Sequence, residues 1–230
     1  MHKSKQNPES EAGFVAGTLA HTREGLRPIE QLKVGDEVLS RPENPAEGTG
    51  TVYKRVVNTS QHKNKQVLRV EYMVEENGVK KYAQVTTTVD HPFWVIGEGW
   101  TAANGILGNW MGPSRLILKD ATEIDAEGKI WVYATNDPDV GWIAVNGTEG
   151  AGALWDYAQS RLVEAIRVYD FEAWSSGPDD TPYLPFTTPV YNIEVEDYHT
   201  YFVGTHGVWV HDADCARIKP VSGATPKRQQ

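Results

Sequence analysis

Residues suited to proton transfer stand in three segments that lie far apart in this sequence. Thr88 and His91 are three positions apart, His199 lies far downstream, and His211 directly precedes Asp212. Imidazole takes up and releases protons near neutral pH, so these segments hold the residue types of an acid–base site.

Each of these side chains also fits a purely structural role. His91 precedes Pro92, and a residue before proline adopts extended backbone. His199 suits a turn at a sheet edge, and His206, between two glycines, suits the turn of a hairpin. The run of threonines at 86–88 suits any strand, because β-branched residues favour strands. Only the occurrence of the segments together favours chemistry.

We expect neither a cofactor nor a metal ion. His21 and His62 have no partners at the spacing of metal ligands, and Cys215 is the single cysteine. Cys215 forms no internal disulfide; three residues after Asp212, it is either the remnant of a downstream nucleophile or an ordinary thiol.

Composition limits the class of protein and its partners. The 230 residues are 40% hydrophobic, enough for one substantial core. A net charge of −9 argues against a non-specific hold on nucleic acid or an anionic membrane. No apolar run reaches the ~20 residues of a membrane-spanning helix, and the polar start lacks a signal-peptide core.

Alternating apolar residues predict an all-β domain. Asn77-Gly78 predicts a tight hairpin turn, residues 204–207 a second hairpin, and residues 28–32 a short helical turn with proline first. The expected strands are 37–39, 52–57, 66–74, 79–88, 93–96, 130–133, 163–171, 190–195, 200–203 and 208–210.

Three stretches depart from this regular pattern. Residues 152–166 have one helical face and predict one short helix. Residues 97–150 carry many breakers and are either an insertion or part of the scaffold. We expect flexible tails at 1–12 and 216–230, flanking one domain at 13–215.

Three sequence blocks, in this order along the chain, together resemble the Hint (Hedgehog/intein) domain. Their residues are most similar to those of the pretoxin-HINT type of bacterial polymorphic toxins. Residues 13–40 resemble its opening, residues 88–92 its T-x-x-H block, and residues 190–212 its two closing blocks. The likeness is good over 13–98 and 190–212 and poor between them. It implies an all-β horseshoe of antiparallel strands with pseudo-two-fold halves and one short helix in the insertion, which brings the ends of the module together.

The resemblance also implies self-cleavage at the two ends. At the front of such a domain, a Cys, Ser or Thr attacks the preceding carbonyl, assisted by the Thr and His of T-x-x-H. These positions correspond to Gly13, Thr88 and His91, and the bond follows Ala12.

At the back of such a domain, a terminal Asn closes on its own carbonyl and cuts the chain as a succinimide, with two histidines easing proton transfer. The histidines correspond to His211 and His199, the terminal residue to Asp212, and the bond leads to Ala213.

This sequence departs from the family pattern at both reacting positions. Gly13 has no nucleophile, and Asp212 is charged at neutral pH where an Asn is usual, although it could form an anhydride. Asn192 stands where many inteins place an Asp or Cys that couples the two steps. We therefore expect a stable Ala12–Gly13 bond and slow cleavage after Asp212, faster at mildly acidic pH. Both replacements are compatible with a natural or an engineered origin.

The resemblance implies release of a C-terminal toxin from a larger secreted or cell-surface bacterial effector, with this chain impaired. The expected partners are segments of its own precursor, an N-terminal carrier and a C-terminal toxin payload, and the domain is expected to be a monomer. One alternative is a non-catalytic structural or presenting module of such a toxin. Another is an unrelated acidic β-sandwich that binds a protein.

Overall fold

The structure, a computed structural model, describes residues 11–48, 50–109, 112–144, 151–167 and 184–212. Ala213, Cys215 and the segments at 1–10, 168–171 and 216–230, for which a role or a structure was predicted, lie outside these ranges. The predicted all-β fold is confirmed. The strands are β1 (Phe14–Val15), β2 (Leu19–Thr22), β3 (Gly25–Pro28), β4 (Glu37–Ser40), β5 (Val52–Glu76), β6 (Val79–Thr88), β7 (Pro92–Val95), β8 (Gly99–Ala102), β9 (Arg115–Ile117), β10 (Glu123–Ala134), β11 (Val140–Ala144), β12 (Ala151–Asp156), β13 (Arg161–Arg167), β14 (Thr187–Val195), β15 (Thr200–Val203) and β16 (Val208–His211).

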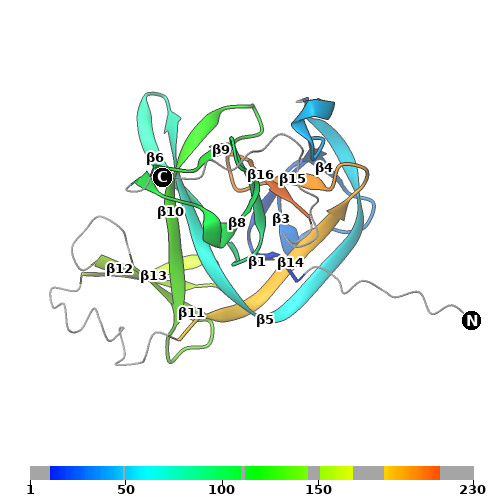
Figure 1. The fold of residues 1–230 in the computed structure, drawn as a ribbon. Coiled ribbons are helices and arrows are strands. Elements are labelled where there is room, and N and C mark those ends of the chain that lie inside the picture. The colour runs from blue at the N-terminus through cyan, green and yellow to red at the C-terminus, as the bar shows by residue number, and fades with distance from the viewer. Residues whose placement is uncertain (1–10, 49, 110–111, 145–150, 168–183, 213–230) are drawn as a thin grey trace, which may run out of the picture.

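Hydrogen bonding between strands closes a ring. The path runs β10-β9-β7-β16-β15-β2-β4-β5 and returns to β10, because β5 pairs with β4 near its start and with β10 near its end. In Figure 1 the long, curved β5 sweeps under the molecule and up both sides. All of these pairings are antiparallel.

A second, smaller closure holds the start of the domain. The two-residue strand β1 pairs with β14 on one side and with β6 on the other, and both of those strands pair with β5. Phe14 lies opposite Tyr191 of β14 and Thr87 of β6. The backbone just before β1 is therefore fixed between two strands that come from distant parts of the sequence.

The turns follow the sequence signals. Asn77 and Gly78, with φ of 54° and 76°, link β5 to β6 with Glu76 opposite Val79. Residues 204–207 join β15 to β16. The predicted turn at 28–32 is the 3₁₀ helix η1 (Ile29–Gln31), preceded by Pro28. Two further 3₁₀ turns, η2 (Pro45–Glu47) and η3 (Ala103–Gly105), are the only other helical elements in the described ranges.

The prediction of a helix over 152–166 is wrong. Strands β12 and β13 occupy this segment and form a hairpin. Leu162, placed on the apolar helical face by the sequence pattern, is 50% exposed, whereas Tyr157 packs its ring 4.9 Å from that of Phe186. Asp156 accepts a hydrogen bond from the backbone of Gln159, which makes a turn where a helix would continue.

The segment 97–150 belongs partly to the scaffold. Strand β9 and the start of β10 complete the ring, whereas β11 extends outward and pairs with the β12–β13 hairpin at the lower left of Figure 1. The separate strands expected at 52–57 and 66–74 form one strand, β5, whose polar middle pairs with β14.

Two apolar clusters stabilise these parts. The larger lies within the ring and includes Phe14, Tyr201 and Val210. The smaller joins the β11–β13 extension to the ring through Val132, Tyr157 and Phe186. No helix within the described ranges is long and apolar enough to cross a membrane.

Gly141 tests the packing of this extension. A Cβ at Gly141 would lie 2.5 Å from Val132 Cγ1 and 2.8 Å from Tyr157 Cε2. Gly141→Ala is therefore expected to lower the free energy of unfolding by about 1–3 kcal/mol, because buried groups must shift. Urea denaturation measures this. Gly50→Ala is the control, because a Cβ there meets no atom within 4 Å; equal urea midpoints for the two variants would contradict the packing described.

Candidate active site

The backbone of Gly13 is hydrogen-bonded on both sides by the end of β6. Its N–H donates to Thr88 Oγ1 at 3.2 Å, and its carbonyl accepts from the Thr88 N–H and the Thr87 hydroxyl, both at 2.9 Å. All three residues are buried. The nitrogen of the Ala12–Gly13 peptide bond thus contacts the threonine that the T-x-x-H pattern singles out.

The space at Gly13 is closed to a side chain. A Cβ at this position would lie 2.8 Å from the carbonyl oxygen of Tyr191 and 3.1 Å from Val190 Cγ2. Real Cβ atoms do not approach backbone that closely, so a larger residue requires β1 and β14 to separate. Glycine at position 13 supplies no nucleophilic side chain, and its surroundings leave no room for one unless the backbone moves.

His91 lies in the core directly after β6. Its side chain is fully buried, with its ring centroid 4.2 Å from that of Phe14, and the backbone of His211 is near enough to oppose the fall in its pKa. Burial, with a smaller contribution from nearby His211, lowers the pKa of His91 to about 3. His91 is therefore a neutral imidazole at physiological pH.

Asp212 follows β16 and is buried. Oδ2 accepts from the Val195 N–H at 2.9 Å and from His199 Nδ1 at 3.3 Å, and Oδ1 lies 3.4 Å from His211 Nδ1. Burial raises the pKa of this carboxyl, but the hydrogen bonds and the two imidazoles outweigh it, so the pKa is lower than usual. Asp212 is held as a carboxylate.

His211 lies between two carboxylates. Its Nε2 is 2.9 Å from Glu43 Oε2, and its Nδ1 faces Asp212. Because an ionised carboxylate only accepts hydrogen bonds, Glu43 places a proton on Nε2. The same argument places a proton on Nδ1 while Asp212 is ionised, and Nδ1 is the ring nitrogen that faces residue 212.

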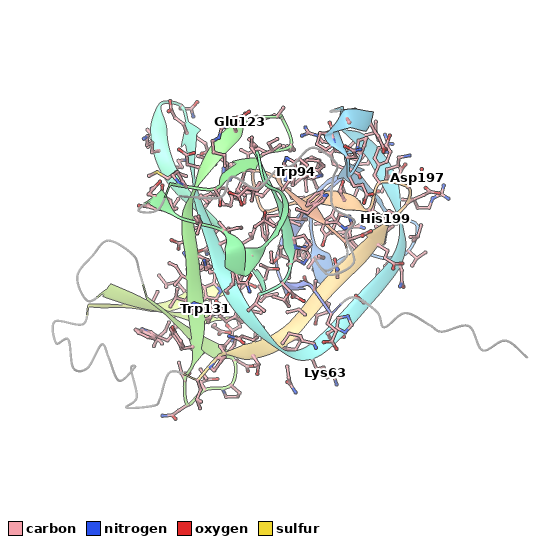
Figure 2. The ribbon with its side chains drawn as sticks, viewed as in Figure 1. Lys63, Trp94, Glu123, Trp131, Asp197 and His199 are labelled. Atoms are coloured by element: carbon pink, nitrogen blue, oxygen red, sulfur yellow. The ribbon has the colours of Figure 1, made fainter. Side chains whose placement is uncertain are left out.

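His199 covers the same carboxylate from the solvent side. Its ring lies nearly parallel to that of His211, at a centroid distance of 6.4 Å, and its side chain is 54% exposed. Figure 2 places His199 beside Asp197 at the end of β14. The hydrogen bond to Asp212 raises the pKa of His199, so this imidazole is charged to a higher pH than usual.

Two adjacent residues of β14 contact the two ends of the predicted module, Gly13 and Asp212. Tyr191 presents its carbonyl to Gly13, and the Asn192 side chain donates from Nδ2 to the main-chain oxygen of Asp212 at 2.7 Å. The charge on His211 lowers the pKa of His91, and the charge on Asp212 raises it. The two ends of the predicted module therefore meet at one short stretch of strand. The catalytic roles of the six predicted site residues stay a prediction.

The sequence assigned no site role to three residues that contact the site: Glu43, Asn192 and Tyr201, whose hydroxyl donates to Asn192 Oδ1. Glu43 stands in a loop with prolines, with no pattern to relate it to His211. Asn192 was interpreted only as a departure from the intein pattern, and Tyr201 only as a strand residue. Both of the last two residues are buried, which the sequence alone does not reveal.

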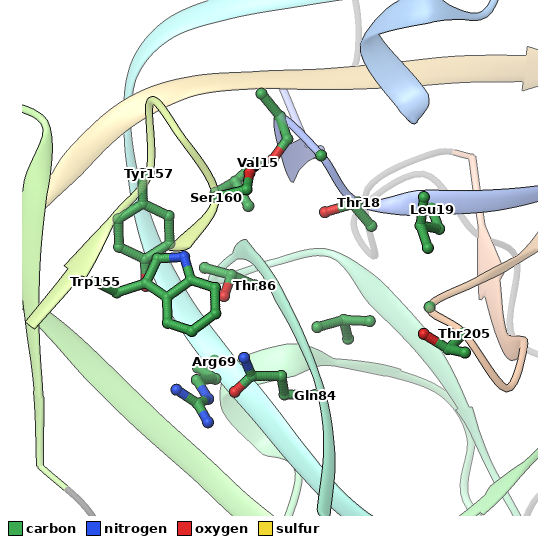
Figure 3. Close-up of a pocket in the computed structure, with 14 residues that line it drawn as sticks. Val15, Thr18, Leu19, Arg69, Gln84, Thr86, Trp155, Tyr157, Ser160 and Thr205 are labelled. Atoms are coloured by element: carbon green, nitrogen blue, oxygen red, sulfur yellow. Dashed lines mark hydrogen bonds between the residues drawn. The ribbon is translucent and has the colours of Figure 1, made fainter. Parts of the chain in front are cut away.

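Two other histidines and one cavity have no residue in common with this cluster. His21 Nε2 donates to the Gly204 carbonyl at 2.8 Å, and His206 pairs with Glu76 at 2.9 Å. A cavity of about 180 Å³ lies near β1. Figure 3 shows Trp155, Tyr157, Arg69 and Gln84 among its lining residues. None of the six predicted site residues lines it, so we do not assign the reaction to this cavity.

The buried state of His91 predicts acid sensitivity. An unfolded histidine titrates near pH 6.5, so below that pH the unfolded chain binds a proton that folded His91 excludes until about pH 3. The contribution of neutral His91 to the free energy of unfolding is thus fully present above pH 6.5 and decreases as the pH is lowered below that value. Between pH 7.5 and 5.0 the loss due to His91 is about 2 kcal/mol. In urea denaturation, His91→Gln should reduce the pH dependence by that amount; an unchanged dependence would contradict it.

Comparisons with known proteins identify the fold. No protein-family model matches the sequence, and no curated protein does. Among solved structures, the chain is similar to a bacterial intein-like domain from Clostridium thermocellum, with 23% identity, coverage of 86% of this chain and 97% of that one, and a TM-score of 0.52.

Two inteins are more distant. The gp41-1 intein is 16% identical, with 88% of this chain and 99% of that chain covered and a TM-score of 0.48. A DnaB intein from Synechocystis is 12% identical, with 88% and 99% covered and a TM-score of 0.48. The first similarity, together with the closed ring of strands, excludes an unrelated β-sandwich. The chain has the fold of a bacterial intein-like (Hint-type) domain.

Proposed function

We propose that this chain is an intein-like autoprocessing domain that cuts its own backbone after Asp212 and so releases a C-terminal toxin segment from a larger bacterial secreted or cell-surface protein. The observation that carries the proposal is the Asp212 carboxylate, buried between His199 and His211 at the end of β16. An N-terminal carrier and the toxin are the proposed flanking segments of a monomeric domain at 13–215.

The proposed reaction is a ring closure. One carboxylate oxygen of Asp212 attacks the carbonyl carbon of the same residue, and the bond to the Ala213 nitrogen breaks. The leaving amine takes its proton from an imidazolium, either His199 or His211. The product is a five-membered anhydride, which water opens to a free carboxyl terminus.

The surroundings of residue 212 hold a carboxylate, and they could also hold an amide. The Val195 N–H is a donor, which fits a side-chain carbonyl oxygen. Once the carboxylate is replaced by an amide, His211 Nδ1, with Nε2 protonated towards Glu43, can act as an acceptor for the side-chain NH₂. An Asn at 212 would therefore have its nitrogen beside a base.

The stabilised carboxylate of Asp212 is the proposed reason for slow cleavage. The hydrogen bonds that keep Asp212 ionised also reduce its reactivity as a nucleophile. A cleavage complete within about an hour has a barrier of roughly 22 kcal/mol, and each tenfold loss of rate adds about 1.4 kcal/mol. Hydrogen bonds that stabilise the carboxylate before it attacks therefore slow the cleavage.

A second candidate function is a non-catalytic module that presents or spaces the flanking segments. The closed space at Gly13 favours it, because no nucleophile can occupy the front position without moving β14. The two candidates differ in what happens after residue 212.

Asp212→Asn tests the proposed function. In the full chain followed by a soluble reporter domain, this variant should cleave after residue 212 at least about 100-fold faster than the parent, about 2.7 kcal/mol of barrier, because the new amide has a donor and a base in place. Intact mass spectrometry over time gives the rate and the cut position.

His211→Gln in the Asp212→Asn background should lose about 10²-fold or more in rate, because the base is removed. His206→Gln is the matched control, because His206 pairs with Glu76 outside the cluster. An Asp212→Asn chain that stays intact would favour the presenting module.

Gly13→Cys tests the front position. With a reporter domain fused before residue 1, this variant should leave the peptide bond between residues 12 and 13 uncut. It should also unfold at a lower urea concentration, because its Cβ collides with the Tyr191 carbonyl. The free energy of unfolding should be lower by about 1–3 kcal/mol. Gly50→Cys is the control for adding a thiol, since that position is open. Cleavage at the front of the Gly13→Cys chain would refute the steric argument.

A further inference from the structure

We propose that Asn192 is a catalytic residue that stabilises the negative charge on the Asp212 carbonyl oxygen during ring closure, and that Tyr201 is the residue that positions it. This inference rests on the proposed function, because it concerns the same bond. It assigns a role to a residue whose position in the sequence suggested only a departure from the intein pattern.

The contact is made to the atom on which charge develops. Asn192 Nδ2 donates to the main-chain oxygen of Asp212 at 2.7 Å, and both residues are buried. When the side chain of residue 212 attacks its own carbonyl carbon, this oxygen becomes an oxyanion. A donor fixed at this distance forms a hydrogen bond with the neutral carbonyl oxygen. This hydrogen bond becomes stronger as negative charge develops on the oxygen in the transition state.

The orientation of the Asn192 amide is set by its other contacts. Its Oδ1 accepts from the Tyr201 hydroxyl at 2.7 Å and from the Ile193 N–H at 2.9 Å. Two donors on one end identify that end as the oxygen, which leaves the NH₂ group for Asp212. The hydrogen bonds therefore exclude the flipped amide, which would place an oxygen against the carbonyl.

Tyr201 is well suited to hold this arrangement. It lies on β15, fully buried, and its hydroxyl reaches across to Asn192 on β14. Burial and the nearby Asp212 charge raise the pKa of its hydroxyl, so Tyr201 stays a neutral donor. Asn192 itself is fixed by the pairing of β14 with β5, opposite Ser60.

A small cavity beside the contact affects what a variant would do. Asn192, Asp212 and Ser60 are among the residues that line a space of about 30 Å³. That is room for a water molecule. In Asn192→Ala, water can take up part of the lost donor role, whereas in Asn192→Asp an ionised carboxylate would face the carbonyl oxygen.

The experiment uses the full Asp212→Asn chain with a C-terminal reporter domain, in which ring closure is measured as the rate of cleavage after residue 212. At pH 7.5, Asn192→Asp should be about 10²–10³-fold slower and Asn192→Ala less severely affected. As the pH falls, the rate of Asn192→Asp relative to its parent should rise, because a protonated carboxyl donates a hydrogen bond. A purely structural role predicts no such recovery.

Tyr201→Phe should slow cleavage only when Asn192 is present. In the Asn192→Ala background, removal of the hydroxyl should have little further effect, because the two residues act as one unit. Tyr72→Phe is the matched control, since Tyr72 is also buried and its hydroxyl has no hydrogen-bond partner among the described residues. Asn64→Asp controls for the added charge at an exposed position.

The outcomes separate the two proposals. Cleavage of Asp212→Asn at an equal rate with and without Asn192 would overturn the role of Asn192 and leave the proposed function standing. Additive effects of Tyr201→Phe and Asn192→Ala would overturn the positioning role. A chain that is uncut in the Asp212→Asn background, with an unchanged urea midpoint, would overturn both proposals.

Discussion

The pairing of β5 with strands at both of its ends is the constraint on which the rest of the structure depends. Because β5 pairs with β4, β14, β6 and β10, it closes the large ring and also holds the two strands that flank β1. A slip of one residue between β14 and β5 would turn Asn192 to the opposite face of the sheet and remove its contact with Asp212. The register of one strand pair thus controls the meeting of the two ends.

The two ends differ in what that framework provides. At the front, backbone from β6 and β14 encloses Gly13 and leaves no space for a nucleophile. At the back, the Val195 N–H and the His211 imidazole contact the Asp212 side chain. The main-chain carbonyl of Asp212 accepts a hydrogen bond from Asn192. In the proposed reaction the back therefore retains the groups that ring closure uses, although hydrogen bonds stabilise the attacking carboxylate of Asp212 and so lower its reactivity. This asymmetry is why we place the proposed reaction after residue 212.

The sequence predicted those features that depend on local patterns. Alternation defined most strands, and Asn77-Gly78 defined its hairpin, because both signals lie within a few residues. The segment at 152–166 was misassigned because its apolar residues fit a helical face, whereas pairing with β11 makes it a hairpin. Burial against Phe186 comes from a residue more than twenty positions downstream, which periodicity cannot detect.

The candidate site was predictable in part. Blocks of sequence pointed to Thr88, His91, His199 and His211, because the resemblance covers those segments. The Glu43 contact joins residues 168 positions apart through an irregular loop, so no local pattern indicates it. The low pKa of Asp212 also depends on contacts that only the fold creates: the sequence suggested a carboxyl that protonates in mild acid, whereas the hydrogen bonds shift this to lower pH.

The most direct test of the central claim, that residue 212 closes a ring on its own carbonyl, is the mass of the N-terminal product from the Asp212→Asn chain. Ring closure predicts a fragment that ends at residue 212 and is one water molecule lighter than the same fragment with a free carboxyl terminus. A fragment that has a free carboxyl terminus from the earliest times, or that ends at another residue, would contradict the account.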